Sequence, residues 1–280
     1  MHVVRDAQAG PHPIPIFDVD DPRIAPYRQV REKDLVGREG LFIAEGAVVL
    51  PHLARSPTCE AVSVLIADSR FDALGPLLGQ FDPHVPVYCA SQAVMDAIVG
   101  FPIHRGVLGL GRRKADLQLS GLASNLGVRA LVLVLVGISN HDNMGALFRN
   151  AAAFGADAVI LDATCCDPLY RKAIRVSAGA CLDLPYVRLA PEADLLGVLC
   201  EHGFSPLALS PSGNVALSET PRPGRAAVLL GPEGPGLPDH LLDRSMTVRI
   251  PMAQGFDSLN VAVAGALALH HMAFVAKAKE

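Results

Sequence analysis

The strongest constraint on the fold is the run Leu131 to Val136, which is apolar at every position and β-branched at every second one. A strand with one face in water alternates apolar and polar residues, whereas this pattern is typical of a strand buried on both faces, as in parallel sheets. Further predicted strands follow at 158–161, 206–209, 226–230 and 246–250, separated by helical or loop patterns. The second half of the chain is therefore predicted to form an open α/β sheet, whose ligand crevice lies beyond the carboxyl ends of the strands.

The length of 280 residues is enough for about two domains. Short apolar runs between residues 41 and 110 alternate with helical patterns, which predicts a smaller α/β domain ahead of the parallel sheet. The N-terminus carries several prolines and little periodicity, so it is expected to be irregular. The predicted organisation is a lead-in over 1–20, a first domain over 21–112, a polar linker over 113–124 and a second domain over 125–280.

Composition and charge exclude several classes of protein. The chain has 24 basic and 28 acidic residues, so its net charge of −4 lacks the global basicity of an architectural nucleic-acid binder. Its apolar runs are shorter than the roughly 18 residues that a membrane-spanning helix needs, and its N-terminus lacks a signal-peptide pattern. The six cysteines show neither a CxxC pair nor zinc-site spacing. We therefore expect a cytoplasmic protein with reduced thiols, no metal site and no membrane contact.

The first polar motif, GISNHDNMGALFRNAAAFG, directly follows the doubly buried strand. Asp142 or Asn143 is a natural N-cap and Gly155 a natural stop, so a helix is predicted over residues 144–154. The apolar residues of this helix recur at helical spacing, and Arg149 falls on the opposite side. Asn143 and Arg149 are therefore either a cap and a solvent-facing cation, or polar groups presented to the crevice.

The second polar motif, LGPEGPGLP, covers residues 230–238 and follows another apolar strand. Its glycines and prolines keep side chains out of the way, so backbone amides and carbonyls can approach a ligand closely. The motif lacks the GKS/T ending of a P-loop and the GxGxxG pattern, which disfavours a nucleotide-phosphate site. Glu233, its only charged residue, is either an exposed carboxylate of a turn or a polar group of a ligand site.

The third polar motif, IPMAQGFDSLN, spans residues 250–260 and leads into a helix predicted over 259–275. Ser258 is a candidate N-cap, which places Asn260 in the first turn. The helix is apolar on nearly all sides, so it is buried either in the domain or against another subunit. The helix contains the small residues Gly265, Ala266 and Ala268, which would allow a second subunit to pack closely against it in a dimer interface.

Together, the three motifs resemble the SpoU/TrmH family of RNA ribose 2′-O-methyltransferases, within the SPOUT class. The matching segments are NHDNMGALFRNAAAFGADAV, LLGPEGPGL and IPMAQGFDSLNVAVAGAL, in the family's order, and VSAGACLDLP is a further match. The resemblance covers residues 130–275 and implies a deep trefoil knot at the carboxyl end of the parallel sheet. Two shorter segments, FIAEGAVVL and HRGVLGL, resemble the family's N-terminal substrate-binding domain, which has a ribosomal-protein-like α/β fold.

The resemblance also implies a cofactor and partners. S-adenosylmethionine would lie in the knot, held largely by backbone atoms, and the chain would form a homodimer through the knotted domain and its final helix. The implied substrate is tRNA or rRNA rather than DNA, because only RNA carries the 2′-hydroxyl nucleophile. The implied cofactor-binding residues are Leu230, Gly231, Gly234, Ile250, Met252 and Leu259.

The catalytic pocket implied by the resemblance contains Asn143, Arg149, Glu233, Ser258 and Asn260. A guanidinium stays protonated at neutral pH and is a poor base, so we expect Arg149 to stabilise negative charge on the ribose oxygen or a neighbouring phosphate. Glu233 would either orient Arg149 or accept the proton of the hydroxyl. The other three side chains would position groups through hydrogen bonds.

Two local basic clusters are candidates for contacts with RNA phosphates, namely Arg112, Arg113 and Lys114, and Arg171, Lys172 and Arg175. Two alternative functions stay open. One is an RNA-binding protein of the same fold that does no chemistry, and the other is a knotted enzyme that methylates an RNA base. The presence of Asn143, Arg149 and the Ser258–Asn260 segment favours ribose methylation.

Overall fold

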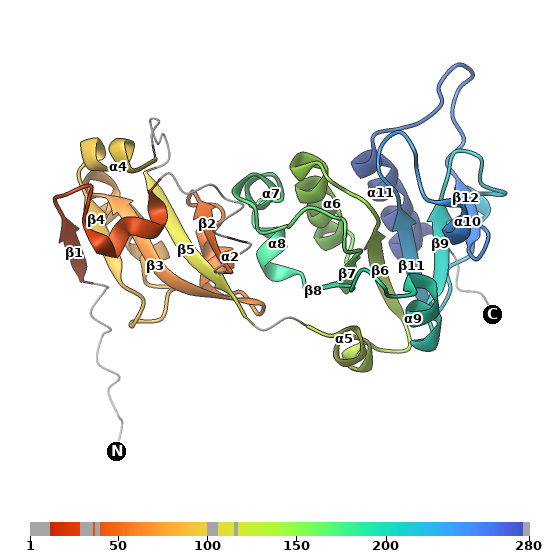
Figure 1. Cartoon of the computed structure of the whole chain (residues 1–280), viewed down its shortest axis with the longest axis horizontal. Helices are drawn as coiled ribbons and strands as arrows, with labels where there is room; N and C mark the ends of the chain where they lie inside the picture. The colour runs from red at the N-terminus through yellow and green to blue at the C-terminus, as the bar shows by residue number, and fades with distance from the viewer. Residues whose placement is uncertain (1–11, 29–35, 37–39, 100–105, 115–116, 277–280) are drawn as a thin grey trace. The chain divides into compact units, whose positions relative to one another are not determined.

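The structure is a computed structural model that describes residues 12–28, 36, 40–99, 106–114 and 117–276. The chain divides into two compact units, residues 1–114 and 115–280. Figure 1 shows the helices and strands of each unit.

In its described residues, unit 1 contains the strands β1 (Pro13–Ile16), β2 (Leu41–Glu45), β3 (Cys59–Ala67), β4 (Val87–Ala90) and β5 (Val107–Arg113). Its helical segments are η1 (Pro22–Tyr27), α2 (Leu50–Ala54), η2 (Asp68–Arg70), η3 (Asp72–Leu74), α3 (Gly75–Leu78) and α4 (Gln92–Val99). The five strands form one sheet in the order β1-β4-β3-β5-β2. Strand β4 is parallel to β1 and β3, whereas β5 is antiparallel to β3 and β2.

The predicted irregular lead-in over 1–20 is wrong in its described part, because Pro13–Ile16 forms strand β1. Among the strands of the described residues, this strand lies at the edge of the sheet and pairs with β4 alone. Proline has no backbone N–H, and an edge strand tolerates it because one side of the strand needs no partner. Ile16 is 2% exposed and anchors the strand in the core of unit 1, beside Ile24 and Leu65.

The boundary between the units also differs from the predicted linker over 113–124. Arg113 is the last residue of β5, and helix α5 (Leu119–Asn125) belongs to unit 2. Leu119 and Leu122 are buried in the core of unit 2, whereas the other side of this helix is exposed. Ser120 and Ser124 face water on the exposed side of this short amphipathic helix, so part of the polar composition of the segment belongs to a helix of unit 2.

The strands of unit 2 are β6 (Ala130–Leu135), β7 (Ala158–Leu161), β8 (Tyr186–Arg188), β9 (Ser205–Leu209), β10 (Val215–Ala216), β11 (Arg225–Leu230) and β12 (Met246–Arg249). Besides α5, its helical segments are α6 (His141–Ala153), α7 (Arg171–Val176), α8 (Ala180–Asp183), α9 (Leu195–Glu201), η4 (Leu217–Glu219), α10 (Asp239–Leu242), α11 (Val261–His270) and a π-helical turn η5 (His271–Val275). The seven strands of the described chain form one sheet in the order β10-β12-β9-β11-β6-β7-β8. All of its pairs are parallel, which confirms the predicted sheet.

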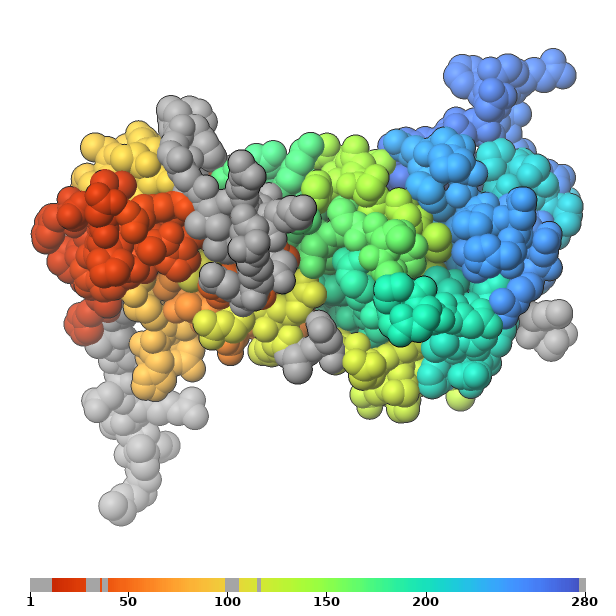
Figure 2. All heavy atoms as spheres, in the orientation of Figure 1, coloured from red at the N-terminus to blue at the C-terminus, as the bar shows by residue number. Residues whose placement is uncertain are grey.

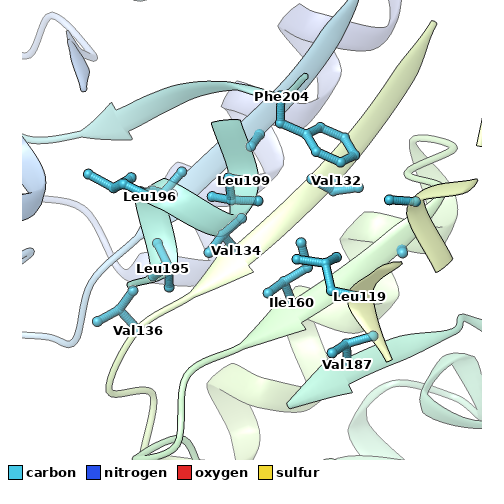
Figure 3. Close-up of a cluster of buried hydrophobic side chains, with 14 of the residues drawn as sticks. Leu119, Val132, Val134, Val136, Ile160, Val187, Leu195, Leu196, Leu199 and Phe204 are labelled. Carbon is cyan, nitrogen blue, oxygen red and sulfur yellow. The ribbon is translucent and has the colours of Figure 1, made fainter. Parts of the chain in front are cut away.

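Strand β6 is buried on both faces of the sheet, as its composition predicts, and none of its residues is more than 1% exposed. On one face, Val134 belongs to a cluster with Leu199 of α9, which Figure 3 shows. On the other face, α11 packs against α6 and the sheet, because a Cβ at Gly265 would lie 2.8 Å from side-chain atoms of both Leu147 and Leu230. The sheet is therefore a central layer with helices on both sides.

The chain leaves the neighbouring strands β6 and β11 toward opposite faces of the sheet. After β6 it enters α6 on one face, and after β11 it enters α10, whose Leu241 belongs to the cluster on the other face. In open α/β sheets such a divergence marks the crevice in which ligands bind. Gly137 has a φ of +64°, and a Cβ there would lie 3.3 Å from Pro232, so the two loops approach closely. The fold thus places the first and second polar motifs side by side.

The helices of the first and third motifs, α6 and α11, begin at residues other than those predicted. Helix α6 begins at His141, because the side chain of Asn140 accepts hydrogen bonds from the backbone N of Asp142 (2.8 Å) and Asn143 (3.3 Å). Neither Asp142 nor Asn143 is therefore the N-cap. Helix α11 begins at Val261 with Asn260 as its N-cap, so Ser258 does not cap it.

Helix α11 is buried on one side and exposed on the other, although its sequence is apolar nearly all round. Gly265 and Ala268 are buried against the chain's own core, so they allow close packing within the unit rather than in a dimer seam. The exposed side carries Val263 (49% exposed), Leu267 (43%) and, in η5, Phe274 (67%). We call these three residues the α11 apolar row.

Candidate functional site

Three polar side chains from distant segments meet at the crevice between β6 and β11. Nδ2 of Asn143, in the first turn of α6, donates to Oε1 of Glu233 in the loop after β11 (3.1 Å). Nδ2 of Asn260 donates to the same carboxylate oxygen (2.9 Å) and to Oδ1 of Asn143 (3.0 Å). We call these three residues the amide–carboxylate cluster.

The amide of Asn260 is oriented by its second role as the cap of α11. Its Oδ1 accepts hydrogen bonds from the backbone N of Ala262 (2.9 Å) and Val263 (3.4 Å), so its Nδ2 faces Glu233. Asn143 is 9% exposed, whereas the Glu233 side chain is exposed. Both hydrogen bonds to the Glu233 carboxylate end on Oε1. No described residue donates a hydrogen bond to Oε2, so this oxygen is available to a ligand.

A pocket of about 520 Å³ opens beside this cluster, at the carboxyl ends of β9, β11 and β12. Glu233, Ser258 and Asn260 line it, and Asn143 is joined to it by its hydrogen bonds to two of them. Arg149 is not among the lining residues. The lining does include all six predicted cofactor-binding residues, Leu230, Gly231, Gly234, Ile250, Met252 and Leu259.

Sequence reasoning missed other residues of this pocket. Leu209 is the last residue of β9, the segment 210–212 follows that strand, and Asp239 and Leu242 belong to α10. No motif marks them. The rule that ligands bind at the carboxyl ends of parallel strands is the signal that could have found Ser210 and Ser212, because their strand was predicted.

The loop after β11 forms one wall of the pocket with its backbone. A Cβ at Gly231 would lie 2.5 Å from the backbone C of Gly236 and N of Leu237, so only glycine fits there. Gly234 and Gly236 have φ values of +89° and +71°, a region that favours glycine. Backbone atoms are therefore accessible to a ligand along this wall.

Arg149 lies on α6 six residues after Asn143, which is about 9 Å further along the helix axis. Its side chain is exposed, and no described residue forms a hydrogen bond or ion pair with its guanidinium. In a single chain, therefore, Glu233 does not orient Arg149. The structure brings four of the five predicted catalytic residues to the pocket or its rim and leaves Arg149 apart.

The third motif forms an exposed loop over residues 250–260, between β12 and α11, and Figures 1 and 2 show it standing clear of unit 2. Gly255, with a φ of +89°, lets the loop turn, and Phe256 near its tip is 73% exposed. Both ends of the loop line the pocket, through Ile250 and Leu259 among others. The loop therefore borders one side of the pocket.

The basic cluster of unit 1 is only partly free to meet a ligand. Arg112 forms an ion pair with Glu60 (3.2 Å), in which both side chains are 50% exposed. Nζ of Lys114 donates to two backbone carbonyls of the segment 56–57. Arg113, at the end of β5, is half-buried. Surface ion pairs of this kind are weak, so Glu60 holds Arg112 only loosely.

The basic cluster of unit 2 lies on helix α7. Lys172 forms an ion pair with Asp142 of α6 (2.6 Å), and about half of each side chain is exposed. Arg175 is exposed and Arg171 is half-buried. This cluster and Asn143 are thus placed by the same helix pair, since α7 packs against α6.

All six cysteines are free thiols. Burial, followed by the negative charge of Asp162, raises the pKa of Cys165 to about 12. Burial likewise raises the pKa of Cys166 to about 11, with a smaller effect from Asp167. In the described ranges, no three His, Cys, Asp or Glu side chains are grouped to hold a metal ion. No described helix is both long and apolar enough to cross a bilayer.

The chain matches the SpoU rRNA Methylase family over residues 130–270. A protein named as an uncharacterized tRNA/rRNA methyltransferase of Mycobacterium bovis is 40% identical over 265 residues, which cover 91% of this chain and 90% of that relative. The 23S rRNA (guanosine-2′-O-)-methyltransferase RlmB of Neisseria meningitidis is 32% identical over 66% of this chain and 75% of its own length.

The chain is also similar to solved structures of RNA methyltransferases. A structure titled as an RNA 2′-O ribose methyltransferase has a TM-score of 0.74 and 27% identity, and covers 92% of this chain and 98% of that one. The AdoMet-bound rRNA methyltransferase from Sinorhizobium meliloti shares the fold, with a TM-score of 0.78 and 20% identity over 92% of this chain and 97% of that one. The extent of these matches shows that the chain belongs to the SpoU rRNA methylase family.

Proposed function

We propose that the protein transfers a methyl group from S-adenosylmethionine to a ribose 2′-hydroxyl of tRNA or rRNA. The observation that carries this proposal is the amide–carboxylate cluster at the rim of the pocket formed by the second and third motifs. The names of the relatives, tRNA/rRNA methyltransferase and guanosine-2′-O-methyltransferase, support the reaction. RNA is the substrate because DNA has no 2′-hydroxyl.

The pocket fits S-adenosylmethionine in size and chemistry. Its volume of about 520 Å³ lies within the range of small-molecule sites. Apolar side chains such as Ile250 and Leu259 suit an adenine ring, while the exposed backbone after β11 and the carboxylate of Asp239 suit the polar parts of the molecule. When bound, S-adenosylmethionine supplies a methyl group that its sulfonium activates.

Glu233 is the proton acceptor in this proposal. Two amide hydrogen bonds to Oε1 hold the carboxylate in place, and Oε2 can accept the hydrogen of the ribose hydroxyl. The hydroxyl oxygen would bond to the methyl carbon as the bond between that carbon and the sulfonium sulfur breaks. The cofactor would leave as a neutral thioether, and the hydroxyl proton would pass to Oε2 of Glu233. Asn143 and Asn260 are positioning residues, because they act on the ribose through Glu233. Ser258, exposed at the rim, can hydrogen-bond the ribose directly.

Arg149 would act on the RNA backbone rather than on the proton. It stays cationic at neutral pH, is exposed, and lies about 9 Å along α6 from Asn143. These properties suit a contact with a phosphate next to the target ribose, where a fixed positive charge stabilises the negative charge of the reacting nucleotide. The basic residues of α7 would extend this contact along the RNA.

The remaining parts of the proposal follow from the family resemblance. Unit 1 would be the substrate-binding domain, with a ribosomal-protein-like fold and phosphate contacts through Arg112, Arg113 and Lys114. The carboxyl end of the unit 2 sheet would hold the trefoil knot, and the protein would act in the cytoplasm. A homodimer through the knotted domain and α11 is supported by the exposed α11 apolar row.

Tritium transfer from labelled S-adenosylmethionine to total RNA, followed by nucleoside digestion, tests the reaction. Wild-type protein is expected to label a 2′-O-methylnucleoside. Glu233→Gln keeps a carbonyl oxygen for the two amides but cannot take the proton, so transfer should fall on the order of 100-fold. Glu219→Gln, an exposed carboxylate in η4, is the control and should retain full activity.

The same assay distinguishes the two alternatives. Label in a methylated base would favour the knotted base methyltransferase. Binding of both S-adenosylmethionine and RNA without transfer of label would favour a protein that binds RNA without chemistry.

A further inference from the structure

We propose that Asp162 is a positioning residue of this site, which holds the turn that begins α6 and thereby sets Asn143 against Glu233. The inference rests on the proposed methyl transfer and extends it to the loop after β7. None of the residues 162–166 of this loop lines the 520 Å³ pocket.

The carboxylate of Asp162 joins the end of β7 to the turn after β6. Its Oδ1 accepts hydrogen bonds from the backbone N of Gly137 (3.2 Å), Thr164 (3.1 Å) and Cys165 (2.9 Å). Its Oδ2 accepts a hydrogen bond from the hydroxyl of Thr164 (2.7 Å). The side chain is half-buried. Asp162 therefore fixes Gly137 to the loop after β7.

Other contacts hold the same two segments together. The backbone N of Ile138 donates to Sγ of Cys165 (3.3 Å), and the N of Cys166 donates to the carbonyl of Ile138 (2.8 Å). Arg188, at the end of β8, supports the loop from its far side. Its guanidinium donates to the carbonyl oxygens of Asp162 (3.2 Å), Cys165 (2.8 Å) and Cys166 (3.1 Å).

The turn leads directly into the site. Gly137 and Ile138 connect β6 to Asn140, whose side chain caps α6 through the N of Asp142 and Asn143. A shift of the turn therefore moves the first turn of α6 and the amide of Asn143. Misplacement of a catalytic group by about 1 Å can lower a rate on the order of 100-fold. Because the loop after β7 does not line the pocket, loss of the Asp162 contacts should leave cofactor binding intact.

Asp157 provides a matched control at the other end of the same two strands. Its Oδ2 accepts a hydrogen bond from the backbone N of Leu131, near the start of β6 (2.8 Å). Asp157→Ala removes a carboxylate contact of the same kind between the same neighbouring strands, but at the amino end of the sheet. Any loss of activity that comes from weakened pairing of β6 and β7 should appear in this variant too.

The test compares Asp162→Ala, Asp162→Asn and Asp157→Ala in the full chain by kinetics, thermal unfolding and hydrogen exchange. Asp162→Ala is expected to lower kcat on the order of 10-fold to 100-fold, with the KM for S-adenosylmethionine unchanged. Exchange of the amides in residues 137–143 should become faster. Asp162→Asn keeps an acceptor oxygen for the three N–H groups and should restore kcat and exchange close to wild-type. Asp157→Ala should lower the Tm but not kcat.

Three results would overturn the proposal. These are equal losses of kcat in Asp157→Ala and Asp162→Ala, unchanged exchange over 137–143 in Asp162→Ala, and an Asp162→Asn variant as impaired as Asp162→Ala. Failure of the proposed function is a different result, because wild-type protein would then transfer no methyl group. The exchange comparison would still measure whether Asp162 holds the start of α6.

Discussion

Asn260 uses the two ends of one amide for two purposes. Its oxygen caps α11, and its nitrogen donates to Glu233 and Asn143. Aspartate in its place would keep the capping oxygen and turn the donor into a second carboxylate oxygen beside Glu233. The capping role and the site role can therefore be separated by one substitution.

Asn260→Asp is expected to keep the stability of the protein and lose most of its activity. Asp caps helices about as well as Asn, so the Tm should stay close to wild-type. Repulsion from the nearby Glu233 carboxylate should disrupt the cluster and lower kcat on the order of 100-fold. Asn260→Ala, which loses the cap as well, should also cost about 1 kcal/mol of stability. Thermal unfolding and methyl-transfer kinetics measure both effects, and full activity of Asn260→Asp would contradict the role of the cluster.

The thiols of the loop after β7 are expected to resist alkylation. Burial raises the pKa of Cys165 to about 12 and of Cys166 to about 11, so at pH 8 each is almost entirely in the unreactive thiol form. Iodoacetamide at pH 8 should therefore modify the exposed Cys200 of the native protein first, and mass spectrometry of peptides identifies the modified residue. Rapid modification of Cys165 without unfolding would show that this loop opens.

At the scale of elements, the strands that are easiest to predict are those that burial makes apolar over most of their length. Strands β6 and β7 are apolar and buried throughout, and the predicted runs 206–209 and 226–230 fall within β9 and β11. Strand β12 has the mixed sequence MTVR, and only Val248 of it is buried. Strands β8 and β10, with three and two residues, are too short to show a pattern. Strand β1 could not be predicted because it contains prolines, which argue against a strand. Prolines are tolerated there because β1 lies at the edge of the sheet. The sequence does not specify which strand will be at the edge.

The contacts of the site were less predictable than its elements. Asn143 lies 90 residues from Glu233 and 117 from Asn260. Their contact depends on the order of strands in the sheet, which hydrophobic periodicity does not encode. The family resemblance supplied these residues as a set, but it did not supply the capping roles of Asn140 and Asn260. It also did not show that Arg149 is exposed and lies outside the pocket lining within one chain.

The packing of α6 on α7 depends on the absence of a side chain at Gly145. A Cβ there would lie 2.5 Å from the carbonyl oxygen of Ala173 and 2.9 Å from the Cβ of Val176. Gly145→Ala should therefore separate the two helices and lower the free energy of unfolding by about 1–3 kcal/mol. Denaturant unfolding measures this change.

Gly121 in α5 is the matched control, because a Cβ there would meet nothing within 4 Å. Alanine is a better helix former than glycine, so Gly121→Ala should raise the free energy of unfolding by about 0.5–1 kcal/mol. Equal effects of the two substitutions would mean that helix propensity, and not the contact of α6 with α7, decides the outcome at Gly145.

At the scale of the whole molecule, the residues of the proposed chemistry all belong to unit 2. The pocket is lined only by residues between Leu209 and Ala264, and Asn143 joins it from α6. Unit 1 contributes none of these residues, which fits its proposed role in choosing the RNA. Two residues of the α11 apolar row, Val263 and Leu267, lie on the helix that Asn260 caps, so a partner on this row would sit close to the site.

A homodimer through α11 predicts that a charge in the apolar row will separate the subunits. Leu267 is 43% exposed, so Leu267→Glu should leave the fold of one chain intact, while the cost of burying an unpaired carboxylate in an interface should yield a monomer. Val128→Glu is the control, because Val128 is 89% exposed and lies just before β6, away from α11 in sequence. Light scattering should report a dimer for the wild-type and Val128→Glu proteins and a monomer for Leu267→Glu, with similar Tm values for the two variants. A Leu267→Glu protein that stays dimeric would place the interface elsewhere, and a wild-type monomer would leave the exposed row for another partner.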